Sequence, residues 1–398
     1  MCSRSAEGPK WEEVIKINRA LGIIFLSAAI CTLVGPATAA AAGPPASPGQ
    51  SQVAAFRKTA CQDYMASLIC PTGLVASRWA TDVDHCECFT TVYKNSLAAF
   101  AFVHERRYGE ARSIFDFFQD RIETPFVGFH QAWNPCTGEA FTSSDRWVGD
   151  NAFLLLALNY YVEKTHDETT YSALVGALKS WLAAEGATCA ADGLIAEGAA
   201  NMYASLAPHP DVDPLTLAAL RGCFESNVNY ECVGDHLNRG SLVFGDLAGF
   251  ESVADFIRTE NWDVDGSEVT ALAAFNGESH SPACSGDGED FINVEISAQN
   301  FAAWRIWKNK AKKDIDLSFL EAELMKLQIP PPVAAGEPVG LPYYVTTACS
   351  CPCGDCTCCT CTRGFCDDSS RAIIDSTAWM CFYLWRFNPY APGKRALD

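Results

Sequence analysis

Four segments of the chain share one pattern, and this internal repeat is the feature that most limits the possible folds. Each segment starts with polar residues, in three cases including an asparagine, and continues with small and large apolar residues. The four are YKNSLAAFAF from Tyr93, GDNAFLLLAL from Gly149, AQNFAAWRIW from Ala298 and DSTAWMCFYL from Asp375, and PLTLAALRGCF from Pro214 is a weaker copy. Such recurrence indicates an architecture of repeated units, each burying its apolar surface against its neighbours.

The segments that follow the repeats are amphipathic instead, as in DETTYSALVGALKSWLAAEG, where Lys179 and Glu185 face outward. A helix that is apolar nearly all round must be buried on all sides. The repeats should therefore form an inner layer of helices and the amphipathic segments an outer layer. Strand signals are scarce, because no series of Val, Ile and Thr runs with a period of two occurs.

We therefore predict an all-α domain over residues 53–392. It should be a toroid of about six helical hairpins, an (α/α)6 ring of roughly twelve helices. In such a ring the polar starts of the inner helices converge on one face, and that face is the expected functional site.

The repeat resembles the six-hairpin glycosidase-like superfamily of (α/α) toroids, whose inner helices read like Asn-Ala-Trp-(Leu/Val)-x-(Leu/Met)-Ala-Leu. The matching stretches are TVYKNSLAAFAF, RWVGDNAFLLLALNYYVEKTHDETTY, NVEISAQNFAAWRIW, GLPYY and IIDSTAWMCFYLWRFNPY. The resemblance covers roughly residues 75–390 and implies the toroid fold, which hosts hydrolases, lyases, epimerases and proteins of unassigned function. This chain departs from its relatives at Lys94, where they often carry an aspartate.

The N-terminal residues 1–42 have the three parts of a secretory signal. Lys16 and Arg19 precede an uncharged run, LGIIFLSAAICTLV, and the small residues of PATAAAAGPPA follow it. This order is that of a signal peptide, and an uncleaved signal anchor is the alternative. Residues 43–52, rich in Pro, Gly, Ser and Ala, read as a flexible linker. The mature protein should be secreted or luminal, either released or held at the membrane by residues 21–42.

The net charge of −19 limits the possible partners. Nucleic acid and anionic lipid both attract basic surfaces, so the chain should bind neither, and membrane contact should be confined to the N-terminal anchor. The expected partner is an oligo- or polysaccharide. No Gly-rich phosphate loop, Gly-x-Ser-x-Gly elbow or His-Glu-x-x-His helix occurs, and we predict no cofactor and no particular metal site.

Glycoside hydrolysis needs one protonated carboxyl group as an acid and one ionised carboxylate. Asp150 is the first candidate for the proton donor, because it starts the most apolar helix, where desolvation would raise its pKa. Glu295, at the equivalent place in a later repeat, is the second candidate, and Asp84 and Asp213 are reserves. The alternative for each acid is that it caps a helix N-terminus.

Aromatic rings and amides at the same helix starts should bind the sugar, since aromatic faces pack on sugar C–H groups and polar partners bind the hydroxyls. The predicted substrate-binding residues are Tyr93, Asn95, Trp147, Asn151, Asn300 and Trp379.

Of the 20 cysteines, many lie in the stretch ACSCPCGDCTCCTCTRGFC, an insertion at residues 349–366 before the last inner helix. Disulfides are expected here if the protein is exported, and thiolate-bound metal is the alternative. The loop cysteines Cys136 and Cys223 are expected to pair as well, whereas Cys381, inside an apolar helix, is expected to be a core residue.

These observations predict an exported carbohydrate-active enzyme, a glycoside hydrolase with paired carboxylates as general acid and base. The alternative is a toroid that binds saccharide or protein without catalysis. An epimerase would be expected to show His pairs at the helix starts, which this sequence does not have.

Overall fold

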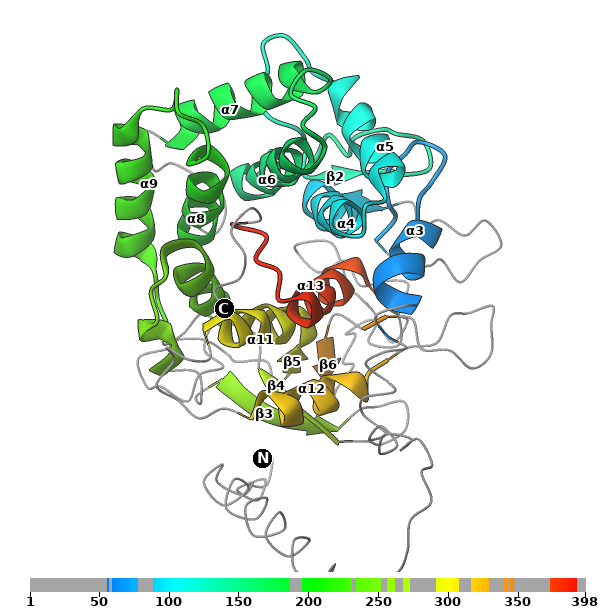
Figure 1. The fold of residues 1–398 in the computed structure, drawn as a ribbon, viewed down its shortest axis with the longest axis vertical. Helices are drawn as coiled ribbons and strands as arrows, with labels where there is room; N and C mark the ends of the chain where they lie inside the picture. The colour runs from blue at the N-terminus through cyan, green and yellow to red at the C-terminus, as the bar shows by residue number, and fades with distance from the viewer. Residues whose placement is uncertain are drawn as a thin grey trace, which may run out of the picture. The chain divides into compact units, whose positions relative to one another are not determined.

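In the computed structural model, six helices form an inner ring, each packed against the next: α4 to α6, α6 to α8, α8 to α10, α10 to α11, α11 to α13, and α13 back to α4 (Figure 1). Their bounds are α4 Val92–His104, α6 Val148–Thr165, α8 Ile195–Leu206, α10 Gly234–Arg239, α11 Val294–Trp307 and α13 Ile374–Trp385. The structure describes residues 56, 59–77, 89–186, 195–230, 234–251, 256–261, 268–272, 291–307, 316–328, 340–341, 344–346 and 373–391. The predicted signal segment, the linker and the Cys-rich insertion lie outside these residues.

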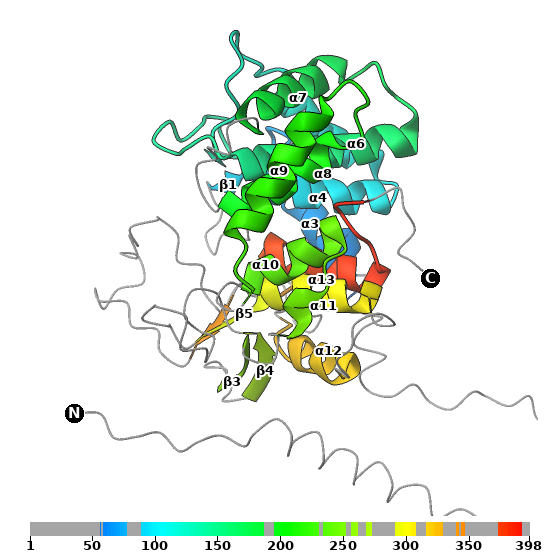
Figure 2. The same cartoon turned by 90° about the vertical axis from the view of Figure 1, so that its left-hand side faces the viewer.

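Among the described residues, four outer helices each follow an inner helix along the chain, and one outer segment precedes the first inner helix. The members of this outer layer are the π-helix η1 Thr59–Tyr64 with α3 Met65–Ser67, then α5 Tyr108–Gln119, α7 Ser172–Gly186, α9 Pro214–Asn227 and α12 Leu317–Met325. Each packs on the inner helix that it accompanies, and Figure 2 shows α7 and α9 in front of α6 and α8. The predicted (α/α)6 toroid is confirmed.

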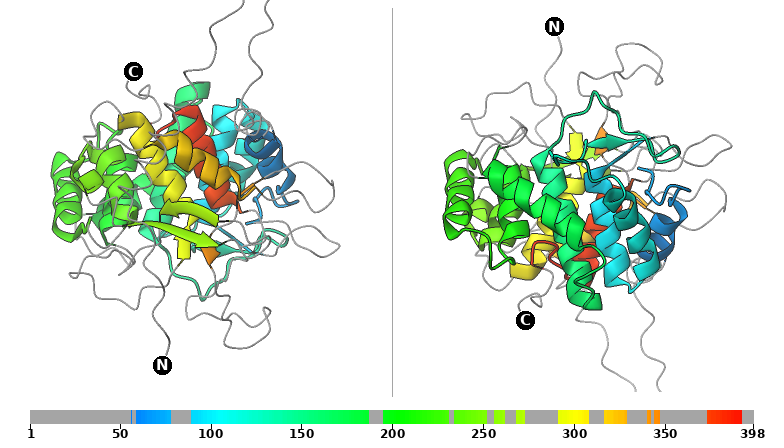
Figure 3. Two further views of the ribbon diagram at one scale, coloured as in Figure 1. Left: turned by 90° about the horizontal axis from the view of Figure 1, so that it is seen from below. Right: turned by 90° about the horizontal axis from the view of Figure 1, so that it is seen from above.

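One place in the outer layer differs from the prediction. After α10 come the π-helix η2 Gly240–Phe244 and the short helix η3 Ala248–Glu251, and then a hairpin of β3 Ile257–Asn261 and β4 Glu268–Leu272. Strands β3 and β4 pair antiparallel from Ile257↔Leu272 to Asn261↔Glu268. The hairpin packs on α11 and α12, as Figure 3 shows from below. Among the described residues between α10 and α11, it stands where an outer helix was expected.

Two smaller antiparallel sheets lie at the starts of inner helices. Strand β1 (Thr90–Thr91) leads directly into α4 and pairs with β2 (Ala132–Trp133), in the register Thr90↔Trp133. Strand β5 (Phe291–Asn293) leads into α11 and pairs with β6 (Tyr344–Thr346), in the register Phe291↔Thr346. These pairings fix where the two helices begin.

The inner and outer helices differ in burial as their sequences predict. In α6, every residue from Asn151 to Leu158 is buried, whereas α7 buries only Leu174, Leu178, Leu182 and Gly186. The first set covers the whole circumference of a helix, and the second recurs every four residues on one face. PLTLAALRGCF, interpreted above as a weak inner copy, is outer helix α9, which buries only Leu220, Cys223 and Phe224.

A disulfide joins the two ends of the domain. Cys61 of η1 is bonded to Cys381 of α13 across 320 residues of sequence. Cys381 lies in the core, as predicted, but it is also disulfide-bonded, which the sequence did not suggest. An apolar surrounding does not prevent pairing when a second cysteine packs on the same helix. Cys70 and Cys223 are also disulfide-bonded, as predicted for Cys223.

No described helix combines the length and the apolar character that crossing a membrane would require.

Candidate functional site

Charged side chains are buried where the inner helices begin. Lys94 of α4, Asp150 of α6, Asp235 of α10, Glu295 of α11 and Asp375 of α13 are all 4–9% exposed. All lie in the first turn of their helix. A buried charge is strongly unfavourable unless it is paired or neutralised. We call these five residues, together with Glu197 of α8 and Arg239 at the end of α10, the acid cluster.

Arg239 is the centre of one half of the acid cluster. Its guanidinium is 1% exposed and forms ion pairs with Glu197 and Asp235. It also donates to Gln299 Oε1 at 3.1 Å. The negative charges of Asp235 and Glu197 keep the pKa of Arg239 raised, although burial opposes this. Arg239 thus joins α10 to α8 by an ion pair and to α11 by a hydrogen bond.

Glu295 is the centre of the other half. Its Oε1 accepts hydrogen bonds from the Tyr93 hydroxyl at 2.8 Å and from Gln299 Nε2 at 2.7 Å. The Tyr93 hydroxyl in turn accepts from the indole nitrogen of Trp379 at 2.8 Å. Since Gln299 also contacts Arg239, a continuous polar network connects Trp379 on α13 with Glu197 on α8.

Lys94 and Asp375 form a buried ion pair with an Nζ–Oδ2 distance of 2.7 Å. Lys94 thereby neutralises a carboxylate on α13. Asp150 lies within the electrostatic range of both partners. Its Oδ2 is buried and has no hydrogen-bond partner among the described residues.

Burial raises the pKa of three of these acids and so favours their protonated forms. It raises the pKa of Asp150 to about 7, and the charge of Asp375 adds to this effect. Burial likewise raises the pKa of Glu295 to about 8, with further increases from Asp375 and Asp235. The pKa of Glu197 is raised too, first by burial. Strong shifts at one place mark a candidate site for proton transfer.

The three asparagines predicted to bind substrate are instead bonded to the protein backbone. Asn95 accepts from the N–H of Val75, and Asn151 accepts from the N–H of Phe129 at 2.9 Å and donates to the carbonyl of Phe129 at 3.0 Å. Asn300 donates to the carbonyl of Gly234 at 3.1 Å. All three are fully buried, so we assign them to the fold, where each fastens a neighbouring segment to an inner helix.

This assignment predicts that Asn151→Ala destabilises the protein by about 2–4 kcal/mol, because buried groups of Phe129 lose their partners. Asn300→Ala should cost about half as much, since Asn300 Oδ1 has no partner among the described residues. Urea denaturation followed by circular dichroism measures both. Equal losses would contradict the assignment.

The remaining predicted residues are dispersed. Trp379 is fully buried and positions Tyr93, so it presents no open face. Trp147 is half-buried and precedes α6, and its carbonyl accepts from Asn151. Asp213 is exposed on the outer layer, where its side chain accepts from the N–H of Leu215 at 2.9 Å as the N-cap of α9, which is the alternative stated above. Asp84 lies outside the described residues.

Glu295 lies at nearly the same place in α11 as Asp150 in α6, as the sequence suggested. Asp150 is the third residue of its helix and Glu295 is the second residue of its helix. Both carboxyl groups therefore belong to the acid cluster, because the helix starts converge.

Sequence analysis did not identify Asp235, Arg239 or Gln299 as site residues. Asp235 and Arg239 belong to α10, whose six residues GDHLNR carry no apolar pattern. A motif that could have identified them is the (i, i+4) spacing of the two opposite charges. No group of three or more His, Cys, Asp or Glu in the described part of the chain is arranged to hold a metal ion.

The sequence matches no protein-family profile and no curated protein. Solved structures, however, share its fold. The cellobiose 2-epimerase of Bacillus thermoamylovorans aligns with a TM-score of 0.56 at 12% identity, over 85% of this chain and 99% of that one. A D-mannose isomerase gives 0.53 at 10% identity, over 84% and 95%. An alpha-amylase of Clostridium perfringens gives 0.52 at 11% identity, over 83% and 98%.

These neighbours are six-hairpin glycosidase-like toroids, and the predicted resemblance is confirmed at the level of the fold. At this identity the likeness extends to the architecture alone. The reaction has to be argued from the acid cluster.

Proposed function

We propose that this chain is an exported carbohydrate-active enzyme that hydrolyses a glycosidic bond in an oligo- or polysaccharide. The observation that carries the proposal is the pair of buried acids at the starts of α6 and α11, with pKa values near 7 for Asp150 and near 8 for Glu295. The named activities of the structural neighbours support a sugar as the substrate.

The two pKa values favour particular roles. Burial and the neighbouring carboxylates raise the pKa of Glu295 to about 8, so we assign to Glu295 the proton needed by the leaving oxygen. Asp150 Oδ2 has no hydrogen-bond partner in the described part of the chain, and this oxygen can accept a proton from water. We therefore assign Glu295 as general acid and Asp150 as general base, although the sequence alone favoured Asp150 as proton donor.

Neighbouring residues support these roles. Tyr93 donates a hydrogen bond to Glu295 Oε1 and thereby orients the carboxyl group, while Trp379 fixes the Tyr93 hydroxyl. The charge of Asp375 raises the pKa of both acids. Half-buried Tyr93 and Trp147 are the aromatic rings that we propose as sugar contacts.

A toroid that binds saccharide or protein without catalysis is the second candidate. The buried Lys94–Asp375 ion pair favours this second candidate, because Lys94 neutralises the carboxylate of Asp375 at the face where the inner helices begin. Binding would then require only the polar network and the aromatic rings.

The export that we propose rests on the signal-like N-terminus and on the disulfides. The Cys61–Cys381 bond supports an oxidising compartment, and so does the finding that Cys70 and Cys223 are each disulfide-bonded. Protease digestion of a C-terminally tagged chain in intact vesicles tests it, and a tag accessible from the cytosol would contradict it.

A sugar panel tests the function. The secreted protein would be incubated with cello-, manno-, malto- and xylo-oligosaccharides, with binding and reducing-end release both measured. We expect release from at least one of these sugars. Binding without release would support the non-catalytic saccharide-binding toroid. The absence of both signals would refute the hydrolase and the saccharide-binding toroid.

A further inference from the structure

The segment that follows α13 turns back into the ring. Arg386 ends the helix with φ at 55°, and the N–H of Phe387 then bonds to the carbonyl of Phe382 at 2.9 Å. Figure 1 shows the segment up to residue 391 running from α13 into the middle of the ring. Asn388 holds this segment to η2, because its side chain donates a hydrogen bond to the carbonyl of Leu242 at 3.0 Å.

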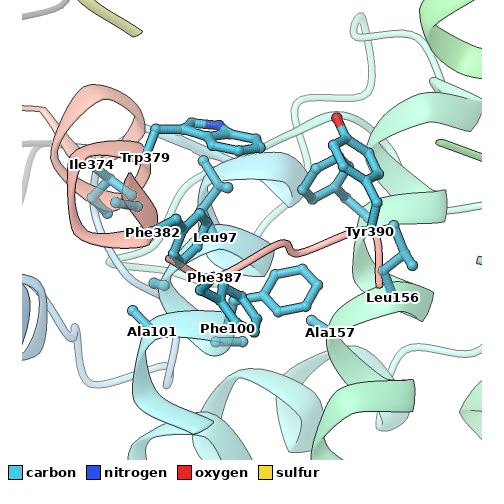
Figure 4. Close-up of a cluster of buried hydrophobic side chains, with 14 of the residues drawn as sticks. Leu97, Phe100, Ala101, Leu156, Ala157, Ile374, Trp379, Phe382, Phe387 and Tyr390 are labelled. Carbon is cyan, nitrogen blue, oxygen red and sulfur yellow. The ribbon is translucent and has the colours of Figure 1, made fainter. Parts of the chain in front are cut away.

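This segment delivers Tyr390 to the centre of the ring. The Tyr390 ring is 5% exposed and packs edge-on against Phe153, with centroids 5.4 Å apart. A bond of 3.0 Å from its N–H to Asn388 Oδ1 fixes its backbone. In Figure 4 the Tyr390 hydroxyl and the Trp379 indole nitrogen lie on the same side of the apolar residues, away from Phe387. That nitrogen bonds to Tyr93, so the hydroxyl points toward the acid cluster.

The hydroxyl of Tyr390 has no hydrogen-bond partner among the described residues. The pKa of Tyr390 is raised, first by burial. The charges of the nearby acid cluster also act on it, namely those of Arg239, Asp235, Glu197 and Glu295. A buried hydroxyl without a partner is unfavourable, and such groups usually bind water or a ligand.

We propose that Tyr390 is a saccharide-binding residue whose hydroxyl bonds to a sugar hydroxyl at the acid cluster, so that the C-terminal segment forms part of the binding site. This inference rests on the proposed function. Both partners can donate and accept, so the contact suits a neutral sugar. The charged side chains nearby are already paired with one another, as Arg239 is with Glu197 and Asp235, and this leaves the phenol as an uncharged contact.

The test is calorimetric binding of the tightest-binding oligosaccharide from the cello-, manno-, malto- and xylo- series. Tyr390→Phe removes only the hydroxyl and should weaken binding about threefold to tenfold, the worth of one neutral hydrogen bond. Tyr160→Phe is the matched control, because its buried hydroxyl lies near the other end of α6, 3.4 Å from His104 Nδ1; its affinity should equal that of the wild type.

A second variant keeps the proposal testable if Tyr390→Phe does not fold. Asn388→Ala releases the segment from Leu242 while keeping Tyr390, and it should also weaken binding. Thermal unfolding shows whether each variant is folded. Wild-type affinity in folded Tyr390→Phe would overturn the assignment while the function stands. If the wild type itself binds none of the sugars, the proposed function fails and the assignment of Tyr390 fails with it.

Discussion

Replacing Arg239 by methionine should destabilise the domain by about 3–5 kcal/mol at pH 8, because the substitution leaves buried carboxylates without their cation. Arg239 joins Glu197 and Asp235 to Gln299 and is 1% exposed. Methionine keeps much of the side-chain volume of arginine, so the measured loss of stability comes from the missing charge more than from lost packing. Urea denaturation at fixed pH measures it.

The loss should shrink at low pH. The pKa of Glu197 is already raised, first by burial, and the positive charge of Arg239 opposes that shift. Without Arg239 the pKa would rise further. A carboxyl group with a raised folded-state pKa binds a proton on folding, so its contribution favours folding at low pH and is lost as pH rises through the folded pKa. We therefore expect a small defect at pH 5 and the full defect at pH 8.

Arg221→Met is the matched control. Arg221 pairs with Glu225 on the surface of α9, and both side chains are more than half exposed. Exposed pairs contribute little, so this variant should change stability by less than about 1 kcal/mol at either pH. An equal loss in both variants would contradict a special role for the buried arginine.

The fold could be predicted from the sequence at those helices that are buried on all sides. The segments of α4, α6, α11 and α13 are apolar on all sides, and the structure buries them on all sides. Helix α10 was not predicted, because its six residues include a single large apolar side chain, Leu237, and so show no hydrophobic period. Helix α9 was placed in the wrong layer, since apolar content alone does not say which face is covered.

The site was predicted in part, for a different reason. Convergence of helix starts follows from the ring, so acids placed there were reasonable candidates. Whether an amide binds a ligand or the backbone depends on what lies opposite, and Asn151 faces the backbone of Phe129. Tyr390 could not be anticipated, because its place depends on the chain turning back after Arg386.

If hydrolysis is found, Glu295→Gln and Asp150→Asn should each lower kcat by about 10²–10⁴-fold, the usual contribution of one proton-transfer group. Both substitutions keep size and remove titration. Because the two carboxyl groups interact, the wild-type profile reports apparent values for the pair. The rate of hydrolysis by the wild type should rise as pH increases through about 7, where Asp150 ionises. It should fall as pH increases through about 8, where Glu295 loses its proton.

Each variant should remove one limb of this profile. Asp150→Asn should abolish the rise near pH 7 and keep the fall, and Glu295→Gln should abolish the fall and keep the rise. Asp213→Asn is the control, since Asp213 caps α9 on the outer layer and asparagine caps equally well; its activity should be unchanged. If Asp150→Asn instead abolished the fall and Glu295→Gln abolished the rise, the two roles would be reversed and Asp150 would be the proton donor. Full activity in both variants would remove these acids from the chemistry, because a group that must give or take a proton cannot be replaced by an amide without loss.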